Sequence, residues 1–131
     1  MELNIRKWFF SCALVIGGMV LVHDKYTPQR ALAFTHAHRD PRWAPTADFY
    51  IGMAAYLQDQ RPEAEAAFRQ LIADFPKSPY VADALYRLGD MYSDQNRWPE
   101  ARDAFQQYMD SFPNGDKITL VRNRWEYIKF R

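Results

Sequence analysis

The chain repeats itself after 37 residues, and this internal repeat restricts the possible folds more than any other feature. When residues 47–78 are displaced by 37 positions, eleven of them meet an identical residue. A repeat of this length indicates supersecondary units that stack on one another and share a core. The identical pairs are Ala47 and Ala84, Gly52 and Gly89, Gln58 and Gln95, Pro62-Glu63-Ala64 and Pro99-Glu100-Ala101, Ala67-Phe68 and Ala104-Phe105, Gln70 and Gln107, and Phe75-Pro76 and Phe112-Pro113.

The repeated residues are of the types that two antiparallel helices need. Glycine costs about 1 kcal/mol in a helix interior relative to alanine, so Gly52 and Gly89 predict that a second helix crosses close by. Pro62 and Pro99 suit the first turn of that second helix, where no backbone donor is required. Each unit ends at a Phe-Pro pair, because proline disfavours helix at the residue before it. We therefore expect each unit to be a helical hairpin.

These positions resemble the tetratricopeptide repeat (TPR) family. The first unit departs from the family pattern at Ala55, where an aromatic residue is usual, and we expect Tyr56 and Leu57 to fill that space. The step of 37 residues exceeds the usual step of about 34, and the additional residues fall in the joint 75–83. This longer joint is similar to the bacterial cell-envelope subset, such as the tol-pal coordinator and the outer-membrane assembly lipoproteins. The matching positions of the second unit are Leu85, Leu88, Gly89, Tyr92, Ala101, Phe105 and Pro113.

The resemblance implies an all-α fold with two TPR hairpins over residues 47–115. Residues 25–46 form a linker, in which Pro28 to Arg39 are predicted to make one short helix. The apolar stripe of this helix is thin, so we expect it to dock on another part of the chain. Residues 116–131 are predicted to form a capping helix, because repeat arrays need one at their ends. Its apolar residues recur at helical spacing and are Ile118, Val121, Trp125 and Ile128.

Residues 1–24 contain fifteen consecutive uncharged residues, from Trp8 to Val22. As a helix this segment would span about 22 Å, short of the ~30 Å hydrocarbon core of a bilayer unless Arg6 and Lys7 extend to the interface. We interpret it as an uncleaved membrane anchor, an N-terminal transmembrane helix. The alternative is a cleaved secretory signal, which is disfavoured because the Ala-x-Ala site at 31–33 lies too far from the apolar run.

Small residues inside the predicted anchor permit close approach by another transmembrane helix, and they are Ala13, Gly17 and Gly18. The single cysteine, Cys12, lies in the same segment and cannot form an intramolecular disulfide or a multi-cysteine metal site. Basic residues on both flanks leave the orientation undecided by the positive-inside rule. The short N-terminal tail and the family resemblance favour a cytoplasmic N terminus. The anchor would then lie in the bacterial inner membrane and the TPR module in the periplasm.

The family resemblance also implies a binding surface. In TPR proteins the first helix of each hairpin lines a concave face, which serves as a groove for a partner segment. In this chain the groove would be aromatic on one side and acidic on the other. The alternative is that the linker helix covers the aromatic residues. The residues expected in the groove are Phe49, Met53, Tyr56, Tyr86, Asp90, Asp94, Asn123 and Tyr127.

The sequence contains no recognisable catalytic motif, so we expect no enzyme activity, no cofactor and no metal site. The net charge of +1 gives no reason to expect nucleic acid binding. We therefore predict a membrane-anchored scaffold for protein–protein interactions, an accessory or structural subunit of a larger bacterial membrane complex. Its partners would be subunits of that complex, and membrane lipid around residues 8–22. The alternative is an exported, soluble periplasmic adaptor whose N-terminal segment is removed.

Overall fold

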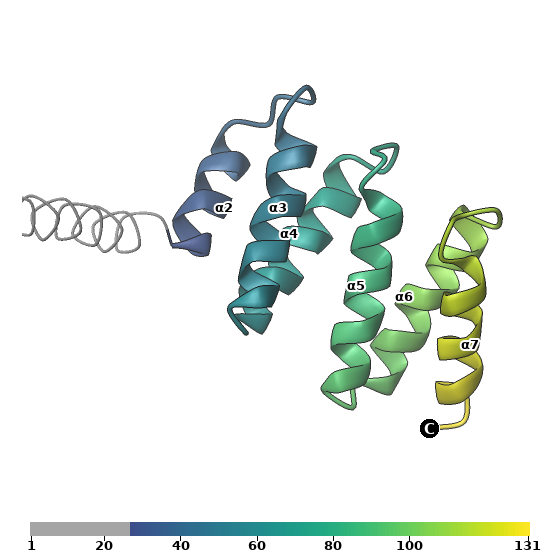
Figure 1. The fold of residues 1–131 in the computed structure, drawn as a ribbon. Coiled ribbons are helices and arrows are strands. Elements are labelled where there is room, and N and C mark those ends of the chain that lie inside the picture. Colours follow the sequence, from purple (N-terminus) through teal and green to yellow (C-terminus); the bar gives the residue numbers. More distant parts are fainter. Residues whose placement is uncertain (1–26) are drawn as a thin grey trace, which may run out of the picture.

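The structure, a computed structural model, describes residues 27–131, which fold into α-helices with no strand in this range. The all-α prediction is therefore confirmed for this part of the chain. Figure 1 shows the helices stacked one after another along the length of the molecule. Their bounds are α2 Pro28–Ala37, α3 Ala44–Leu57, α4 Arg61–Asp74, α5 Val81–Asp94, α6 Trp98–Ser111 and α7 Ile118–Ile128.

Two helical hairpins form the centre of the array, α3 with α4 and α5 with α6. Each hairpin turns through three residues, and each turn contains one residue in the left-handed region of backbone space. These residues are Asp59, with φ of 58°, and Asn96, with φ of 57°. Aspartate and asparagine adopt this conformation more readily than other non-glycine residues, which explains why the chain reverses at these two points.

Equivalent helices begin 37 residues apart, as the sequence repeat predicts. We treat residues 37 positions apart as equivalent and call this correspondence the 37-residue frame. The helices α3, α5 and α7 begin at Ala44, Val81 and Ile118, and α4 and α6 begin at Arg61 and Trp98. In Figure 1 the helices α3, α5 and α7 run side by side in one direction, with α4 and α6 behind them. We call the first set the inner layer and the second set the outer layer.

The short helix α2 packs on α3 and makes a smaller contact with α4. It ends at Ala37, which is 37 residues before Asp74, the end of α4. Thr35 is buried in this contact, and Arg39, just after the helix, pairs with the buried Asp48 of α3. In the 37-residue frame α2 therefore takes the place of the outer helix of a preceding unit.

The two glycines lie where the helices of each hairpin cross. A Cβ atom built on Gly52 would lie 2.6 Å from the ring of Phe68, and one on Gly89 would lie 2.3 Å from the ring of Phe105. Both rings are fully buried. The close crossing predicted from the glycines is confirmed. The fully buried core continues through Ala55, Ala64, Leu71, Ala84, Met91, Ala101 and Val121.

The prediction that Leu57 helps to fill the space beside Ala55 is wrong. Ala55 is completely buried, but the side chain of Leu57 is 77% exposed. Leu57 corresponds to Asp94 in the 37-residue frame, and Asp94 is also exposed. This position faces away from the hairpin partner, so only the half-buried Tyr56 remains close to the core.

The predicted anchor and its small residues Ala13, Gly17 and Gly18 lie outside residues 27–131. Among the helices that the structure describes, none is both long enough and apolar enough to cross a membrane.

Candidate protein-binding surface

Most of the predicted groove residues fall into sets of equivalent positions, 37 residues apart, on the helices of the inner layer. Phe49, Tyr86 and Asn123 occupy equivalent positions on α3, α5 and α7. Met53, Asp90 and Tyr127 form a second equivalent set, one helical turn further along. Because the three helices run in the same direction (Figure 1), both sets lie on one face of the array.

On the first hairpin the aromatic candidates are partly covered by α5 and α4. The ring of Phe49 stacks on Tyr80 with a centroid distance of 4.9 Å. The ring of Tyr56 lies between two guanidinium groups, 5.4 Å from that of Arg61 and 5.8 Å from that of Arg87. Such contacts hold cations on aromatic faces. This part of the face is therefore a half-buried aromatic surface with a basic edge.

On α5 the candidate Tyr86 lies at the base of the face, and the candidate Asp90 supplies the acidic group at its centre. Tyr86 is only 8% exposed and belongs to the core. Burial raises the pKa of Tyr86 above its ordinary value, and the neighbouring Asp90 raises it further. The side chain of Asp90 is 14% exposed and lies 3.7 Å from the guanidinium of Arg124 on α7. The acidic side of the predicted groove is thus largely paired with a cation.

A second ion pair joins α5 to the start of α7. The ammonium group of Lys117 lies 2.6 Å from the carboxylate of Asp83. Asp83 and Asp90 are seven residues apart on α5, and Lys117 and Arg124 are seven apart at the facing positions. Residues seven apart lie on the same side of a helix. The sequence analysis missed this pairing, although the matched spacing of opposite charges was a usable signal.

The remaining candidates lie at the edges of the face. Asp94 points toward the first hairpin, where its carboxylate is 3.6 Å from the guanidinium of Arg61. Tyr127 is 66% exposed, and its hydroxyl accepts a hydrogen bond of 2.9 Å from Arg131. Asn123 is exposed. The face therefore runs from half-buried aromatics on α3, across paired acids on α5, to an exposed tyrosine on α7.

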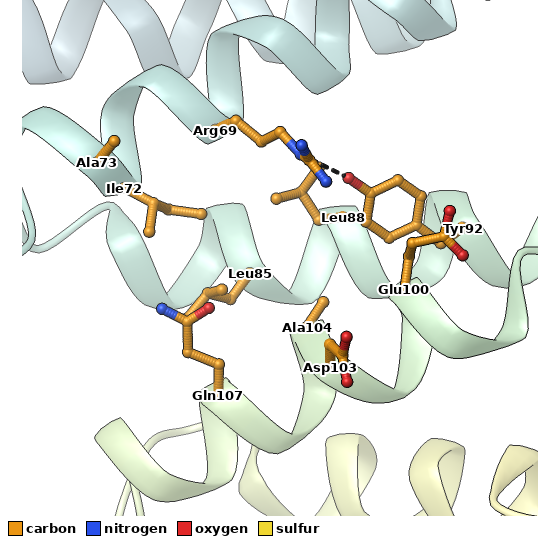
Figure 2. A pocket seen from close by; sticks show the side chains of 10 residues that line it. All are labelled: Arg69, Ile72, Ala73, Leu85, Leu88, Tyr92, Glu100, Asp103, Ala104 and Gln107. Carbon is orange, nitrogen blue, oxygen red and sulfur yellow. Dashed lines mark hydrogen bonds between the residues drawn. The ribbon is translucent and has the colours of Figure 1, made fainter.

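A separate groove is lined by the outer helices α4 and α6 and by α5, which lies between them in Figure 2. Its volume is about 310 Å³. The apolar floor includes Ile72 and Leu88, whereas Arg69 stands on one wall and Glu100 and Asp103 on the other. The opposite charges of the two walls could attract a segment of mixed charge. This outer groove is the alternative to the inner face.

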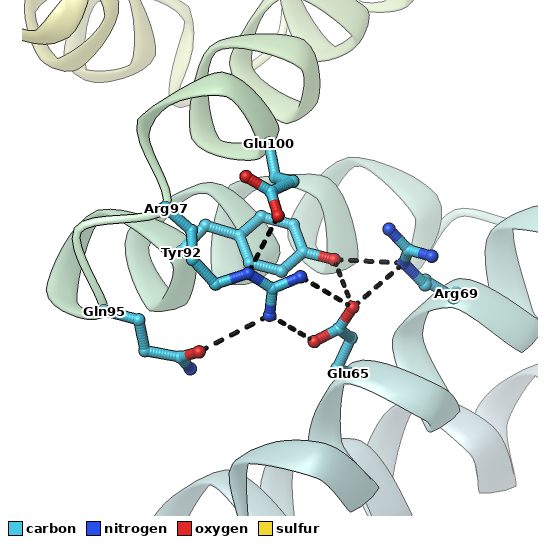
Figure 3. Close-up of polar contacts among 6 residues, drawn as sticks. All are labelled: Glu65, Arg69, Tyr92, Gln95, Arg97 and Glu100. Carbon is cyan, nitrogen blue, oxygen red and sulfur yellow. Dashed lines mark hydrogen bonds and ion pairs between the residues drawn. The ribbon is translucent and has the colours of Figure 1, made fainter. Parts of the chain in front are cut away.

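A polar network closes one end of the outer groove and ties the two hairpins together (Figure 3). The carboxylate of Glu65 on α4 accepts a hydrogen bond of 2.7 Å from Arg97 and one of 2.9 Å from the hydroxyl of Tyr92. Arg69 donates to the same hydroxyl at 3.0 Å. The hydrogen bond from Arg97 lowers the pKa of Glu65, although partial burial opposes it. The network links α4 of the first hairpin to α5 and to the turn before α6 of the second, which is a structural role.

Comparison with known sequences agrees with this geometry. No curated protein sequence is significantly similar to the chain. The sequence profile of the family described as tetratricopeptide repeat matches residues 49–116, more than half of the chain. The matched region begins inside α3, covers the rest of both hairpins and ends just before α7. The chain therefore belongs to the tetratricopeptide repeat family.

Proposed function

We propose that the inner face binds an extended or helical segment of a partner protein, and that the chain is an accessory subunit of a bacterial membrane complex. Repeats of this family bind proteins, and stacked repeats offer extended surfaces for this purpose. The observation that carries the proposal is the continuity of the face across α3, α5 and α7, on which Met53, Asp90 and Tyr127 occupy equivalent positions. The role is binding and positioning, without catalysis.

The chemistry of the face indicates what kind of segment it holds. Half-buried Met53 and Tyr56 supply an apolar contact at one end. Arg87 and Arg124 lie along the same layer, and Asp90 lies between them in the sequence and pairs with Arg124. A segment with an apolar anchor and polar groups of both charges matches this order. Apolar anchors in partly desolvated pockets supply most of the energy of such contacts.

We propose that the segment Trp8–Val22 holds this module at the inner membrane. The absence of charge over fifteen residues supports the anchor, and the long joint 75–83 is similar to the cell-envelope subset of the family. The module would lie in the periplasm, beside membrane-complex subunits and close to lipid. The other candidate, an exported soluble adaptor, requires removal of this segment.

Two measurements test the proposal. Resistance of the full chain to alkaline extraction from membranes, with Met1 intact by N-terminal sequencing, is expected for an anchor. Solubility together with a new N terminus near Phe34 would instead support the exported adaptor.

The binding face is tested with Met53→Ala combined with Tyr56→Ala, measured as recovery of co-purifying partners by quantitative mass spectrometry. We expect recovery to fall about tenfold or more, with the circular dichroism melt retained. The matched control is Asp103→Ala with Gln107→Ala in the outer groove. Loss of partners in this control alone would move the binding site to the outer groove.

A further inference from the structure

The inner helices α5 and α7 contact the unit before them through three positions spaced seven residues apart. For α5 these positions are Tyr80, just before the helix, and Arg87 and Asp94 within it. Seven-residue spacing places them along one side of the helix. They reach back to the first hairpin, where they contact Phe49 at 4.9 Å between ring centroids, Tyr56 at 5.8 Å from guanidinium to ring centroid and Arg61 at 3.6 Å between charged atoms.

The chain around the capping helix α7 uses the equivalent three positions in the same way, the first just before the helix, the second within it and the third beyond its end at Ile128. They are Lys117, Arg124 and Arg131, each 37 residues after its counterpart on α5. Their contacts on the second hairpin are Asp83, Asp90 and the ring of Trp98. The three positions therefore define the side on which an inner helix receives its predecessor.

At α3 the same three positions are Trp43, Tyr50 and Leu57, and they are 37%, 60% and 77% exposed. Within residues 27–131 they contact no preceding inner helix. Tyr50 touches the following unit, where its ring meets the edge of Tyr80 with 6.2 Å between centroids. None of the three carries a charge, whereas the counterparts on α5 and α7 include five charged residues. Beside them Phe34 of α2 is 58% exposed and stacks on Trp43. We call these four residues the open apolar face.

Within the described residues 27–131, the outer helix α2 likewise has no inner helix of its own hairpin. Phe34 corresponds to Leu71 on α4 and to Tyr108 on α6 in the 37-residue frame. Both counterparts are buried, at 0% and 2% exposure, because each has the inner helix of its own hairpin beside it. Among residues 27–131 there is thus no inner helix that packs against both α2 and this side of α3.

The helix α7 of a second copy does not suit this position against α2 and α3. An inner helix contacts its outer helix through positions such as Leu85, Gly89 and Tyr92, which are buried on α5. Among the helices of residues 27–131, the one at the other end of the array is α7, and it carries Arg122, Glu126 and Lys129 at those positions. Placing it against α2 would bury three charges, which is costly without partners. Stacking of α7 from one copy on α2 of another is therefore unfavourable.

We propose that the open apolar face binds a helix of a partner subunit, and that this helix presents an uncharged apolar side to α2 and α3. The proposal rests on the proposed function, in which residues 8–22 lie in the membrane and only residues 23–27 separate them from α2. A helix with apolar residues at i, i+3 or i+4, and i+7 matches the spacing of Trp43, Tyr50 and Leu57. The partner would be a subunit of the same membrane complex.

The chain itself supplies a substitution pair that removes the apolar character of the face without touching the core. Tyr50→Arg with Leu57→Asp introduces the residues that α5 carries at the equivalent positions, Arg87 and Asp94. Both native side chains are mostly exposed, so the fold should survive. The matched control is Leu120→Arg on α7, where a leucine of 42% exposure lies at the opposite end of the array.

The test places a photo-crosslinking amino acid at position 50 of the full chain in cells, and at position 120 as the control. We expect position 50 to form a crosslink to another protein within a helical peptide whose contacting side has no charged residue. The crosslink should fall at least tenfold with Leu57→Asp and should not form from position 120. Crosslinking to lipid alone, to a second copy, or equally from both positions would overturn the proposal.

A disulfide test asks whether residues 7–20 of the same chain, instead of a partner helix, occupy the open apolar face. Displacing the contact of Phe49 with Tyr80 by 37 residues pairs Cys12 with position 43. A disulfide between Cys12 and Trp43→Cys would overturn both this inference and the membrane anchor. Resistance to alkaline extraction without any crosslink from position 50 to a partner helix would overturn this inference alone.

Discussion

Asp48 and Arg39 form an ion pair whose carboxylate is completely buried, with 2.7 Å between the charged atoms. The guanidinium also lies 2.5 Å from the carboxylate of Asp74 and 4.6 Å from the centre of the Phe75 ring. In the 37-residue frame the counterpart of Asp48 is Leu85, a core residue of the second unit. The first joint of the array is thus held by charge at a place where the second joint is apolar.

Arg39→Ala should destabilise the protein by about 3–5 kcal/mol, because it leaves the carboxylate of Asp48 buried without its cation. The free energy of unfolding from urea denaturation measures this effect. Arg39→Met combined with Asp48→Leu should recover most of the loss, since replacing both partners by apolar residues leaves no buried charge. An equal loss in the single and the double variant would show that the pair is not the cause.

Gly89→Ala should destabilise the protein, even though alanine favours helix by about 1 kcal/mol. The added methyl group would lie 2.3 Å from the fully buried ring of Phe105, and overpacking of this kind costs about 1–3 kcal/mol. Thermal melting followed by circular dichroism measures the change. In a Phe105→Leu background the same substitution should cost less. A higher melting temperature for Gly89→Ala alone would contradict the close crossing.

The stability of the array should fall as the pH drops below the ordinary glutamate pKa of 4.5. Hydrogen bonding from Arg97 lowers the pKa of Glu65 in the folded protein. The unfolded state therefore binds more protons in this range, and the stabilisation is lost as the pH falls through the folded-state pKa. Urea denaturation between pH 6 and about pH 3 should show this slope.

Two variants test whether the loss of stability at low pH comes from the hydrogen bonds of Glu65. Glu65→Gln should remove the contribution, and Tyr92→Phe should reduce it partly, because the hydroxyl of Tyr92 also donates to Glu65. An unchanged slope in Glu65→Gln would assign the acid sensitivity to other carboxylates.

The hairpins could be predicted from the sequence because their signals are local and repeated. Gly52, Gly89 and the two Phe-Pro pairs report contacts within one unit, and the structure places them accordingly. Contacts between units were harder to predict. Arg39 with Asp48, and Lys117 with Asp83, join side chains whose meeting depends on how the units stack. Leu57 was misassigned for the same reason, since its surroundings depend on the preceding unit.

The groove residues show the same difference between what the sequence predicts and what depends on contacts between units. Their common face followed from the family resemblance, extended along the chain by spacing, but their exposure did not. Tyr86 is part of the core, and Asp90 and Asp94 are paired with Arg124 and Arg61. A single sequence shows the charge of each residue without showing which opposite charge from another helix will reach it.

The capping helix should depend on its apolar contacts far more than on its ion pairs. Val121 and Ile128 are buried, at 0% and 2% exposure, and truncating such a side chain to alanine costs about 2–5 kcal/mol. Lys117 and Asp83 are more than a third exposed, and an exposed pair contributes at most about 1 kcal/mol.

We therefore expect Ile128→Ala to release α7, with loss of amide-exchange protection over residues 118–128. Lys117→Met should leave that protection almost unchanged at moderate salt. If Lys117→Met instead released the helix, the ion pairs with α5 would be its main attachment. In that case the ion pairs of α7 would supply most of the stability of its packing on α5, and its buried apolar side chains would contribute little.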